Sequence, residues 1–177
     1  MYNCTSMRAF PNRQAIDELA SQYCELDIPS VEVCLVFLDV TAEVYAAFDA
    51  HFARYNLSIG KFTLLMQLYS NREGLAPSEF ADRVGVTRAT ITGLLDGLER
   101  EELVKRVPHP SDRRRLIIRL TPKGEELVAE ILPDHFCRTT GLMANLTIKE
   151  KKTLIKLLSK VQIGTSALLT PVFKKIT

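Results

Sequence analysis

The feature that most constrains the fold of this chain is a run of three short amphipathic helices in its middle third. Apolar side chains recur there every three or four positions, as on the buried face of a helix. Pro77 suits a first helical position, Gly85 supplies a turn because glycine adopts left-handed dihedral angles cheaply, and Thr87 is a suitable N-cap. The helices are predicted over residues 58–70, 78–84 and 87–101. The side chains expected to face the core are Phe62, Leu65, Met66 and Tyr69 on the first helix and Ile91, Leu94, Leu95 and Leu98 on the third.

After these helices the pattern changes to that of a β-hairpin. Residues 103–107 and 115–120 are predicted as short strands, the second of them rich in branched apolar residues. The connection, residues 108–114, is polar and holds two prolines, so we expect a loop there. Two helices joined by a short glycine-containing turn and followed by a basic hairpin are the order of a winged helix-turn-helix.

Helical patterns also precede this central segment. A short amphipathic helix is predicted over residues 12–25, and Pro29 disfavours helical backbone in the residue before it. A long helix is predicted over residues 31–55. That helix is apolar around so much of its circumference that another surface must bury it, and a second subunit is a natural candidate.

Signals for helix starts recur in the C-terminal third. Pro122 follows Thr121 at the first position of another helix. Thr147 and Glu150 have the Thr-x-x-Glu spacing of a capping box, which predicts the start of a last helix. The apolar stripe that follows at helical spacing also requires burial, and it consists of Leu154, Leu157, Leu158 and Val161.

The charge of this chain is small in total but concentrated locally. The formal net charge is +2, and residues 1–60 carry three basic against eight acidic side chains. Residues 105–119, in contrast, carry six basic side chains against Asp112 alone. Such a local excess is what phosphate binding needs, although a solvated surface produces it too. The charge therefore favours nucleic-acid binding only in combination with the expected fold.

The composition is that of an ordinary folded domain, with 46% hydrophobic and 25% charged residues. No apolar run approaches the roughly 20 residues that cross a bilayer, and residues 1–10 lack the apolar core of a signal peptide. We therefore expect a cytoplasmic protein with no membrane partner. The four cysteines are widely spaced, which predicts reduced thiols rather than a disulfide framework.

Two stretches of the chain resemble one known family. Residues 75–100, LAPSEFADRVGVTRATITGLLDGLER, are similar to the helix-turn-helix of the MarR (multiple antibiotic resistance regulator) family, and residues 103–124, LVKRVPHPSDRRRLIIRLTPKG, are similar to its wing. The wing signature Asp-x-Arg-x-x-x-(Val/Ile) is met by Asp112, Arg114 and Ile118. The resemblance extends over about residues 57–128 and is weak before residue 31.

This resemblance implies a mainly α fold with a small β-hairpin wing, in which a winged helix-turn-helix is flanked by N- and C-terminal dimerisation helices. It implies a DNA-binding regulator with no catalytic residues, no metal and no cofactor. The expected organisation is an N-terminal extension with a short helix (1–30), a long dimerisation helix (31–56), the winged helix-turn-helix DNA-binding domain (57–124) and C-terminal dimerisation helices (125–177).

The helix over residues 87–101 is the expected recognition helix. Its side opposite the apolar face carries small residues and short donors, which let a helix approach base edges in the major groove. Arg88 can reach a guanine or a phosphate. Hydroxyl groups that can donate to phosphates or bases are those of Thr87, Thr90 and Thr92.

The expected wing carries three consecutive arginines. The resemblance implies that Arg114, at the tip, inserts into the minor groove, where a narrow groove concentrates negative potential. Asp112 would hold a neighbouring arginine rather than touch DNA, because phosphate repels a carboxylate. Arg113 and Arg115 either bind phosphate or are simply solvated.

The chain departs from the family pattern at two positions. Many members have a threonine that caps the first helix of the helix-turn-helix, but this chain has Ala76 there. Loss of that cap costs about 1 kcal/mol locally. Where many members carry a basic residue on the recognition helix, this chain has Gly97.

The resemblance also implies partners. A homodimer with two-fold symmetry places two recognition helices about one turn of double-stranded DNA apart, so the operator should be a pseudo-palindrome. Members commonly act as repressors and respond to small aromatic ligands, which shift the spacing of the recognition helices. The candidate ligand-binding residues are Tyr45, Phe48, Phe52 and Phe62, each of which core packing also explains.

Other functions remain open at this point. A redox-sensing regulator of the same fold would use Cys24 or Cys34, although the acidic neighbours Glu25 and Glu32 discourage a reactive thiolate. The histidines show no local metal-ligand spacing, and the chain has no glycine-rich phosphate loop or nucleophile motif of an enzyme. A winged helix used only for protein contacts would show no salt-dependent DNA binding.

Overall fold

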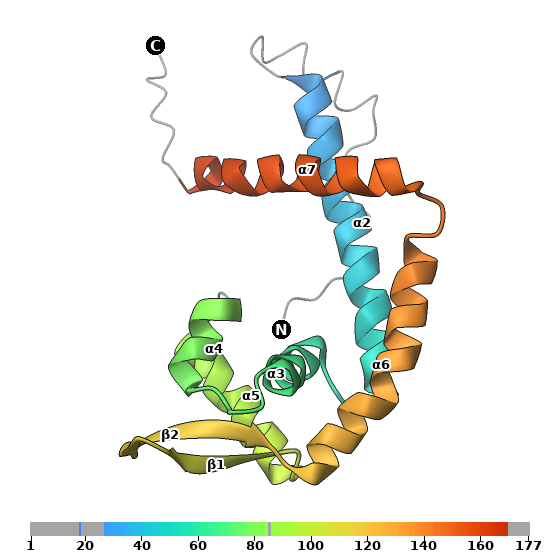
Figure 1. Cartoon of the computed structure of the whole chain (residues 1–177). Helices are drawn as coiled ribbons and strands as arrows, with labels where there is room; N and C mark the ends of the chain where they lie inside the picture. Colours follow the sequence, from blue (N-terminus) through green and yellow to red (C-terminus); the bar gives the residue numbers. More distant parts are fainter. Residues whose placement is uncertain (1–17, 19–26, 85, 170–177) are drawn as a thin grey trace. The chain divides into compact units, whose positions relative to one another are not determined.

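The computed structural model describes residue 18 and residues 27–84 and 86–169 (Figure 1). The helix expected over residues 12–25 lies outside the described residues except for Glu18, and so does the turn expected at Gly85. The elements in chain order are α2 (Ile28–Ala53), α3 (Ile59–Ser70), α4 (Pro77–Val84), α5 (Arg88–Arg100), β1 (Val104–His109), β2 (Asp112–Leu120), α6 (Pro122–Leu142), α7 (Ile148–Gly164) and the 3-10 turn η2 (Thr165–Leu168). The chain divides after Val128 into two compact units.

The core of the first unit lies between α3, α4, α5 and the hairpin. The prediction for α5 is confirmed, since Ile91, Leu95 and Leu98 are buried, with Leu94 half-buried beside them. The prediction for α3 was incomplete. Leu64 and Leu68 are fully buried, whereas Met66 and Tyr69 are only half-buried. Helix α3 contacts α2, α5 and β2, so it buries more of its circumference than a surface helix does.

Local side-chain caps begin several of the helices. The hydroxyl of Ser58 accepts a hydrogen bond from the backbone N–H of Lys61 and begins α3. Thr87 caps α5 as predicted, and Thr147 forms the predicted capping box at α7 with Glu150. Each cap satisfies a backbone N–H group that has no partner inside the helix. The sequence therefore sets these starts locally.

Helix α2 begins three residues earlier than predicted, at Ile28, and ends two residues earlier, at Ala53. Pro29 lies inside its first turn, where the missing N–H group is not needed, so proline does not delay the helix as expected. The described part of the chain contains no helix long and apolar enough to cross a membrane.

The hairpin is longer than predicted, because the strands continue into the segment expected to be a loop. Strands β1 and β2 pair antiparallel from Val104 with Leu120 to His109 with Asp112, and the register shifts between Pro108 and His109. The pairing of backbone groups extends past the apolar residues from which the strands were predicted. The imidazole Nδ1 of His109 accepts a hydrogen bond from the backbone N–H of Ser111, at 3.2 Å, and supports the turn.

Two glycines allow the base of the hairpin to lie close to neighbouring backbone. Gly74 has a φ of +90°, and a Cβ there would lie 2.6 Å from the carbonyl oxygen of Ile118. A Cβ on Gly124 would lie 2.1 Å from the carbonyl oxygen of Leu103. Directly after Gly74, Leu75 forms an antiparallel bridge with Ile118 through two backbone hydrogen bonds of 3.1 and 2.8 Å. The wing is therefore attached to the helix-turn-helix by backbone contacts.

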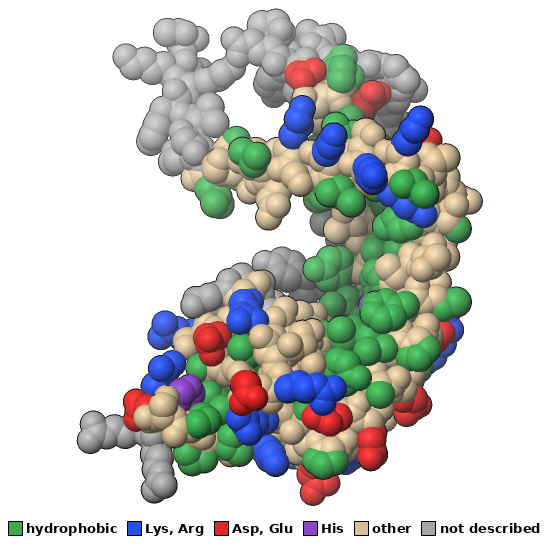
Figure 2. Space-filling model, viewed as in Figure 1, with side chains coloured by type: hydrophobic (Ala, Val, Ile, Leu, Met, Phe, Trp, Pro, Cys, Tyr) green, Lys and Arg blue, Asp and Glu red, His purple; other side chains and the backbone are tan. Residues whose placement is uncertain are grey.

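Large apolar side chains are exposed on both α2 and α7. In the second unit, α7 has no buried residue among those described, and hydrophobic and lysine side chains lie together along it (Figure 2). The most exposed of these side chains on the two helices are Val33, Val36, Val40 and Tyr45 on α2 and Ile148, Ile155, Leu157 and Ile163 on α7. These apolar stripes are thus exposed in the single chain, and their burial by another surface stays a prediction.

Candidate nucleic-acid interface

Helix α5 presents a polar face to solvent opposite its buried leucines. Arg88, Thr92 and Asp96 are each exposed and are spaced by four residues, which places them in one row on the helix. Ala89 and Gly93 are exposed beside them, and a Cβ added to Gly93 would meet nothing within 4 Å. This face can therefore approach another surface closely.

The threonine hydroxyl groups of α5 take part in hydrogen bonds of the helix itself. The Thr87 hydroxyl accepts from the backbone N–H of Thr90, at 3.2 Å, and also bonds the Thr90 hydroxyl, at 2.9 Å. The Thr92 hydroxyl donates to the carbonyl of Arg88, at 2.9 Å. Their oxygens retain acceptor capacity, and one hydroxyl of the Thr87–Thr90 pair keeps a hydrogen to donate, because only the other donates within the pair. Donation to DNA by Thr92 requires an exchange of its bond to the carbonyl of Arg88. The bond of Thr92 within the helix was not predicted.

The wing arginines lie on β2. The structure describes only the backbone of Arg113 and Arg114, and the side chain of Arg115 is exposed. Asp112 is exposed at the start of β2, where it pairs with His109 across the hairpin. The expected support of an arginine by Asp112 stays a prediction.

Among the basic residues of the hairpin whose side chains the structure describes, Arg106 and Arg119 form ion pairs with acidic residues of the same unit. Arg106 pairs with Asp96 and Glu99 of α5, and Arg119 pairs with Glu73, with its Nη2 at 3.2 Å from the carboxylate. Sequence reasoning counted both cations toward a phosphate footprint and missed these pairs. Their charges are balanced within the unit, so these two cations add less to a phosphate footprint than a count along the chain suggests.

The glycine at position 97, the second departure from the family pattern, has a structural explanation. Lys61 of α3 lies over Gly97, where a Cβ would be 3.2 Å from the lysine Cε. The Lys61 ammonium pairs with Glu101 at 2.5 Å. A long side chain at position 97 would compete with this lysine for space. A lysine of α3 thus lies beside the position of α5 at which many family members carry a basic residue.

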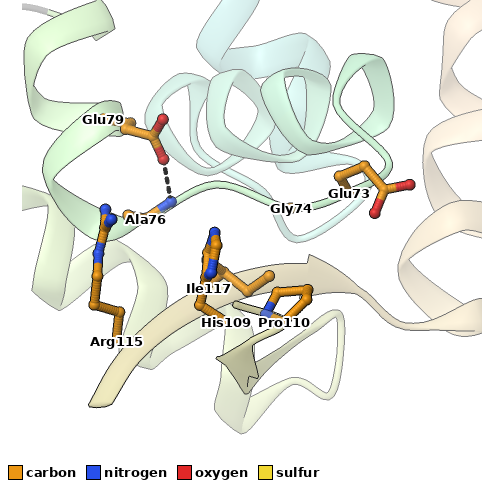
Figure 3. Close-up of a pocket in the computed structure, with 8 residues that line it drawn as sticks. All are labelled: Glu73, Gly74, Ala76, Glu79, His109, Pro110, Arg115 and Ile117. Carbon is orange, nitrogen blue, oxygen red and sulfur yellow. Dashed lines mark hydrogen bonds between the residues drawn. The ribbon is translucent and has the colours of Figure 1, made fainter. Parts of the chain in front are cut away.

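The capping threonine that is missing at Ala76, the first departure from the family pattern, is partly compensated. Ala76 has no capping side chain, but the Glu79 carboxylate accepts a hydrogen bond from the backbone N–H of Ala76, at 2.6 Å (Figure 3). This bond is one half of a capping box. Helix α4 therefore retains the cap that comes from its third residue.

A pocket of about 350 Å³ lies between the wing and the start of α4. Figure 3 shows Arg115 beside Ala76 and Glu79 at one side of it, with His109 and Pro110 from the hairpin below. None of the four aromatic residues expected to bind an effector lines this pocket.

Those aromatic residues lie on α2 and α3. Phe52 and Phe62 are buried and stack on each other with ring centroids 4.1 Å apart. Phe48 is half-buried and stacks on Phe52 at 6.1 Å, while Tyr45 is exposed. The structure therefore brings three of the four into one aromatic stack, of which the inner two belong to the core.

The alternative chemistries find little additional support. Cys34 is exposed, and Cys24 lies outside the described residues, so redox sensing stays a prediction. Within residues 27–84 and 86–169, no three His, Cys, Asp or Glu side chains are grouped so that they could hold a metal ion.

An exposed polar face on the second helix of a helix-turn-helix, beside an arginine-bearing hairpin, defines a winged helix-turn-helix DNA-binding protein. Residues 57–116 match the model of the MarR family. The HTH-type transcriptional repressor YetL of Bacillus subtilis is 37% identical over 153 residues, which cover 86% of this chain and 92% of that relative. The chain belongs to the MarR family of DNA-binding transcriptional regulators, and the expectation that it is not an enzyme is confirmed with it.

Further comparisons agree with this assignment. The HTH-type transcriptional regulator PecS of Dickeya dadantii is 28% identical over 142 residues, 78% of this chain and 84% of that relative. A MepR–DNA complex from S. aureus superimposes with a TM-score of 0.67 at 23% identity, over 74% of this chain and 94% of that one. A MarR variant from E. coli complexed with operator DNA gives 0.68 at 22% identity, over 77% and 98%. These structures confirm the predicted fold.

Proposed function

We propose that this regulator represses transcription as a homodimer that binds a pseudo-palindromic operator. The observation that carries the proposal is the exposed face of α5 beside the arginine-bearing wing. Arg88 and Thr92 lie in one row on that face and would enter the major groove. Arg114 would enter the minor groove, with Arg113 and Arg115 on phosphates.

The exposed apolar side chains of α2 and α7 support the homodimer. A stripe of this kind on a helix needs a partner surface, and an isologous dimer supplies the same stripe from a second copy. Repression follows from occupancy of an operator, and YetL, which is 37% identical, is named a transcriptional repressor. Sedimentation should give a dimer at micromolar concentration, and a monomer at every concentration would contradict this part.

For the effector we propose a small aromatic molecule that binds at the aromatic stack of α2 and α3. Tyr45 and Phe48 offer accessible ring surface, and Phe52 and Phe62 form the base of the stack. Ring stacking favours an aromatic ligand. Such a ligand would release DNA by favouring a different spacing of the two recognition helices.

The DNA-binding proposal is tested with duplexes selected by the protein from a randomised pool. Anisotropy should show tight binding to a selected duplex, weak binding to a scrambled one, and a steep loss of affinity with salt. Arg88→Ala should weaken selected binding at least about tenfold, and Arg114→Ala should lower the salt slope by about one. The control is Arg138→Gln, since Arg138 pairs with Asp134 of α6 at 2.9 Å and has no assigned DNA role. Equal binding of selected and scrambled duplexes would refute sequence-specific regulation.

A further inference from the structure

Arg106 joins the wing to the recognition helix. Its Nη2 donates to the Asp96 carboxylate at 2.5 Å, and its Nη1 donates to the Glu99 carboxylate. Both acceptors are on α5, while Arg106 is on β1. One planar guanidinium therefore bridges two carboxylates and links two elements that no other described ion pair connects.

The same carboxylate also binds the backbone of the wing. The second oxygen of Glu99 accepts a hydrogen bond from the backbone N–H of Arg106 at 3.3 Å. On the opposite strand, Leu75 bridges Ile118, and Arg119 bonds Glu73. The hairpin is thus attached to the helix-turn-helix along both strands. On the side of α5, Arg106 adds side-chain bonds to the backbone bond from the N–H of Leu103 to the carbonyl of Leu98, at 3.0 Å.

Asp96 lies where a free carboxylate would oppose DNA binding. It is in the same row as Arg88 and Thr92 on the exposed face of α5, and its side chain is 49% exposed. An uncompensated carboxylate in this row would repel phosphate. Hydrogen bonding to Asp96, together with the charges of both carboxylates, holds the pKa of Arg106 above its ordinary value, so the guanidinium stays charged beside them.

We propose that Arg106 is a positioning residue for DNA binding, which holds the wing against α5 and neutralises Asp96 without contacting DNA itself. This inference rests on the proposed function and adds a residue that acts through others. Both terminal nitrogens of the guanidinium are bonded to carboxylates, and a direct phosphate contact would have to displace them. The relative placement of wing and recognition helix then depends on a residue with no base or phosphate partner.

The test measures affinity and salt slope for a selected duplex with four variants. Arg106→Gln removes the bridge, and Asp96→Asn removes the carboxylate that would face DNA. The double variant removes both. Glu99→Gln weakens the bonds of residue 99 to the side chain and backbone of Arg106, while Arg106 still neutralises Asp96. The matched control is Lys105→Gln, which removes one positive charge from an exposed neighbour on the same strand that forms no ion pair with the described residues. Thermal melts establish that each variant is folded.

We expect Arg106→Gln to weaken binding about tenfold at an unchanged salt slope, since it removes no phosphate contact. Asp96→Asn alone should stay within about threefold of the parent, and the double variant should recover about threefold over Arg106→Gln. Glu99→Gln should weaken binding at an unchanged slope. If Arg106→Gln does not fold, the result for Glu99→Gln decides.

Three outcomes would overturn the inference. A salt slope that falls by about one in Arg106→Gln, as for a lost phosphate contact, would show direct binding. If the double variant binds the duplex as weakly as Arg106→Gln, the free carboxylate of Asp96 does not oppose DNA binding. If Arg106→Gln or Glu99→Gln binds with the affinity of the parent, the bridge between wing and α5 does not position the wing for DNA. Each of these leaves the proposed function intact, because that function fails only if the parent protein does not discriminate the selected duplex.

Discussion

Substitution of Gly93 by alanine should stabilise the protein and weaken its binding to DNA. Gly93 lies in the interior of α5, where glycine is less favourable than alanine by about 1 kcal/mol. An added Cβ meets nothing within 4 Å, so no clash offsets this gain. For a chain of this size, about 1 kcal/mol raises Tm by about 2–4 °C. Nothing within the described unit therefore requires glycine at this position.

The opposite effect is expected on DNA. The methyl group would project from the face that Arg88 and Thr92 share, where a recognition helix lies within van der Waals distance of base edges. Overpacking of a close interface costs about 1–3 kcal/mol, which corresponds to a loss of affinity of roughly 5- to 150-fold.

The assay combines thermal melts with anisotropy on a selected duplex. Gly141→Ala is the matched control, because a Cβ at Gly141 also meets nothing within 4 Å, and Gly141 lies in the last turn of α6. The control should gain a few tenths of a kcal/mol and keep parental affinity. If Gly93→Ala is more stable and binds DNA as tightly as the parent, α5 does not approach DNA at Gly93, and the docking geometry proposed above is wrong.

Three further predictions concern stability. Gly124→Ala should unfold the wing base and lower Tm sharply, because its Cβ would lie 2.1 Å from the carbonyl of Leu103; an unchanged melt would contradict this packing. Phe52→Ala should cost about 3–5 kcal/mol by denaturant unfolding, since its ring is buried against Phe62, and a loss below 1 kcal/mol would mean that the stack is not core. Burial lowers the pKa of His135 below its ordinary 6.5, so the unfolded chain binds the proton more readily than the folded chain. The free energy of unfolding should therefore rise as pH increases from 5 to 7, and His135→Gln should flatten that rise.

Much of the fold followed from short-range patterns. The apolar spacing on α5 predicted which residues face the core, and Thr87 and Thr147 predicted where two helices begin. The order of helices, turn and hairpin then indicated the winged helix-turn-helix. These signals are readable because a cap joins residues three apart, and a helix face repeats within a few residues.

The errors arose where neighbours distant in sequence decide the outcome. Leu64 and Leu68 were not predicted as core residues, because burial on both sides of α3 depends on the elements that pack there. The strands extend past their apolar residues because backbone pairing does not require apolar side chains. Similarly, Pro29 was assigned a helix-breaking role that its place in the first turn of α2 removes.

The sequence by itself determined the class of protein and the order of helix-turn-helix and basic hairpin, since residue type and local spacing carry that information. Only the tertiary structure showed that two of the hairpin's cations are paired with carboxylates of the same unit. It paired Arg106 with Asp96 and Glu99, and Arg119 with Glu73, over separations of up to 46 residues. A count of charges along a chain cannot show whether a cation is balanced, because Coulomb interactions depend on distance in space and not on separation in sequence.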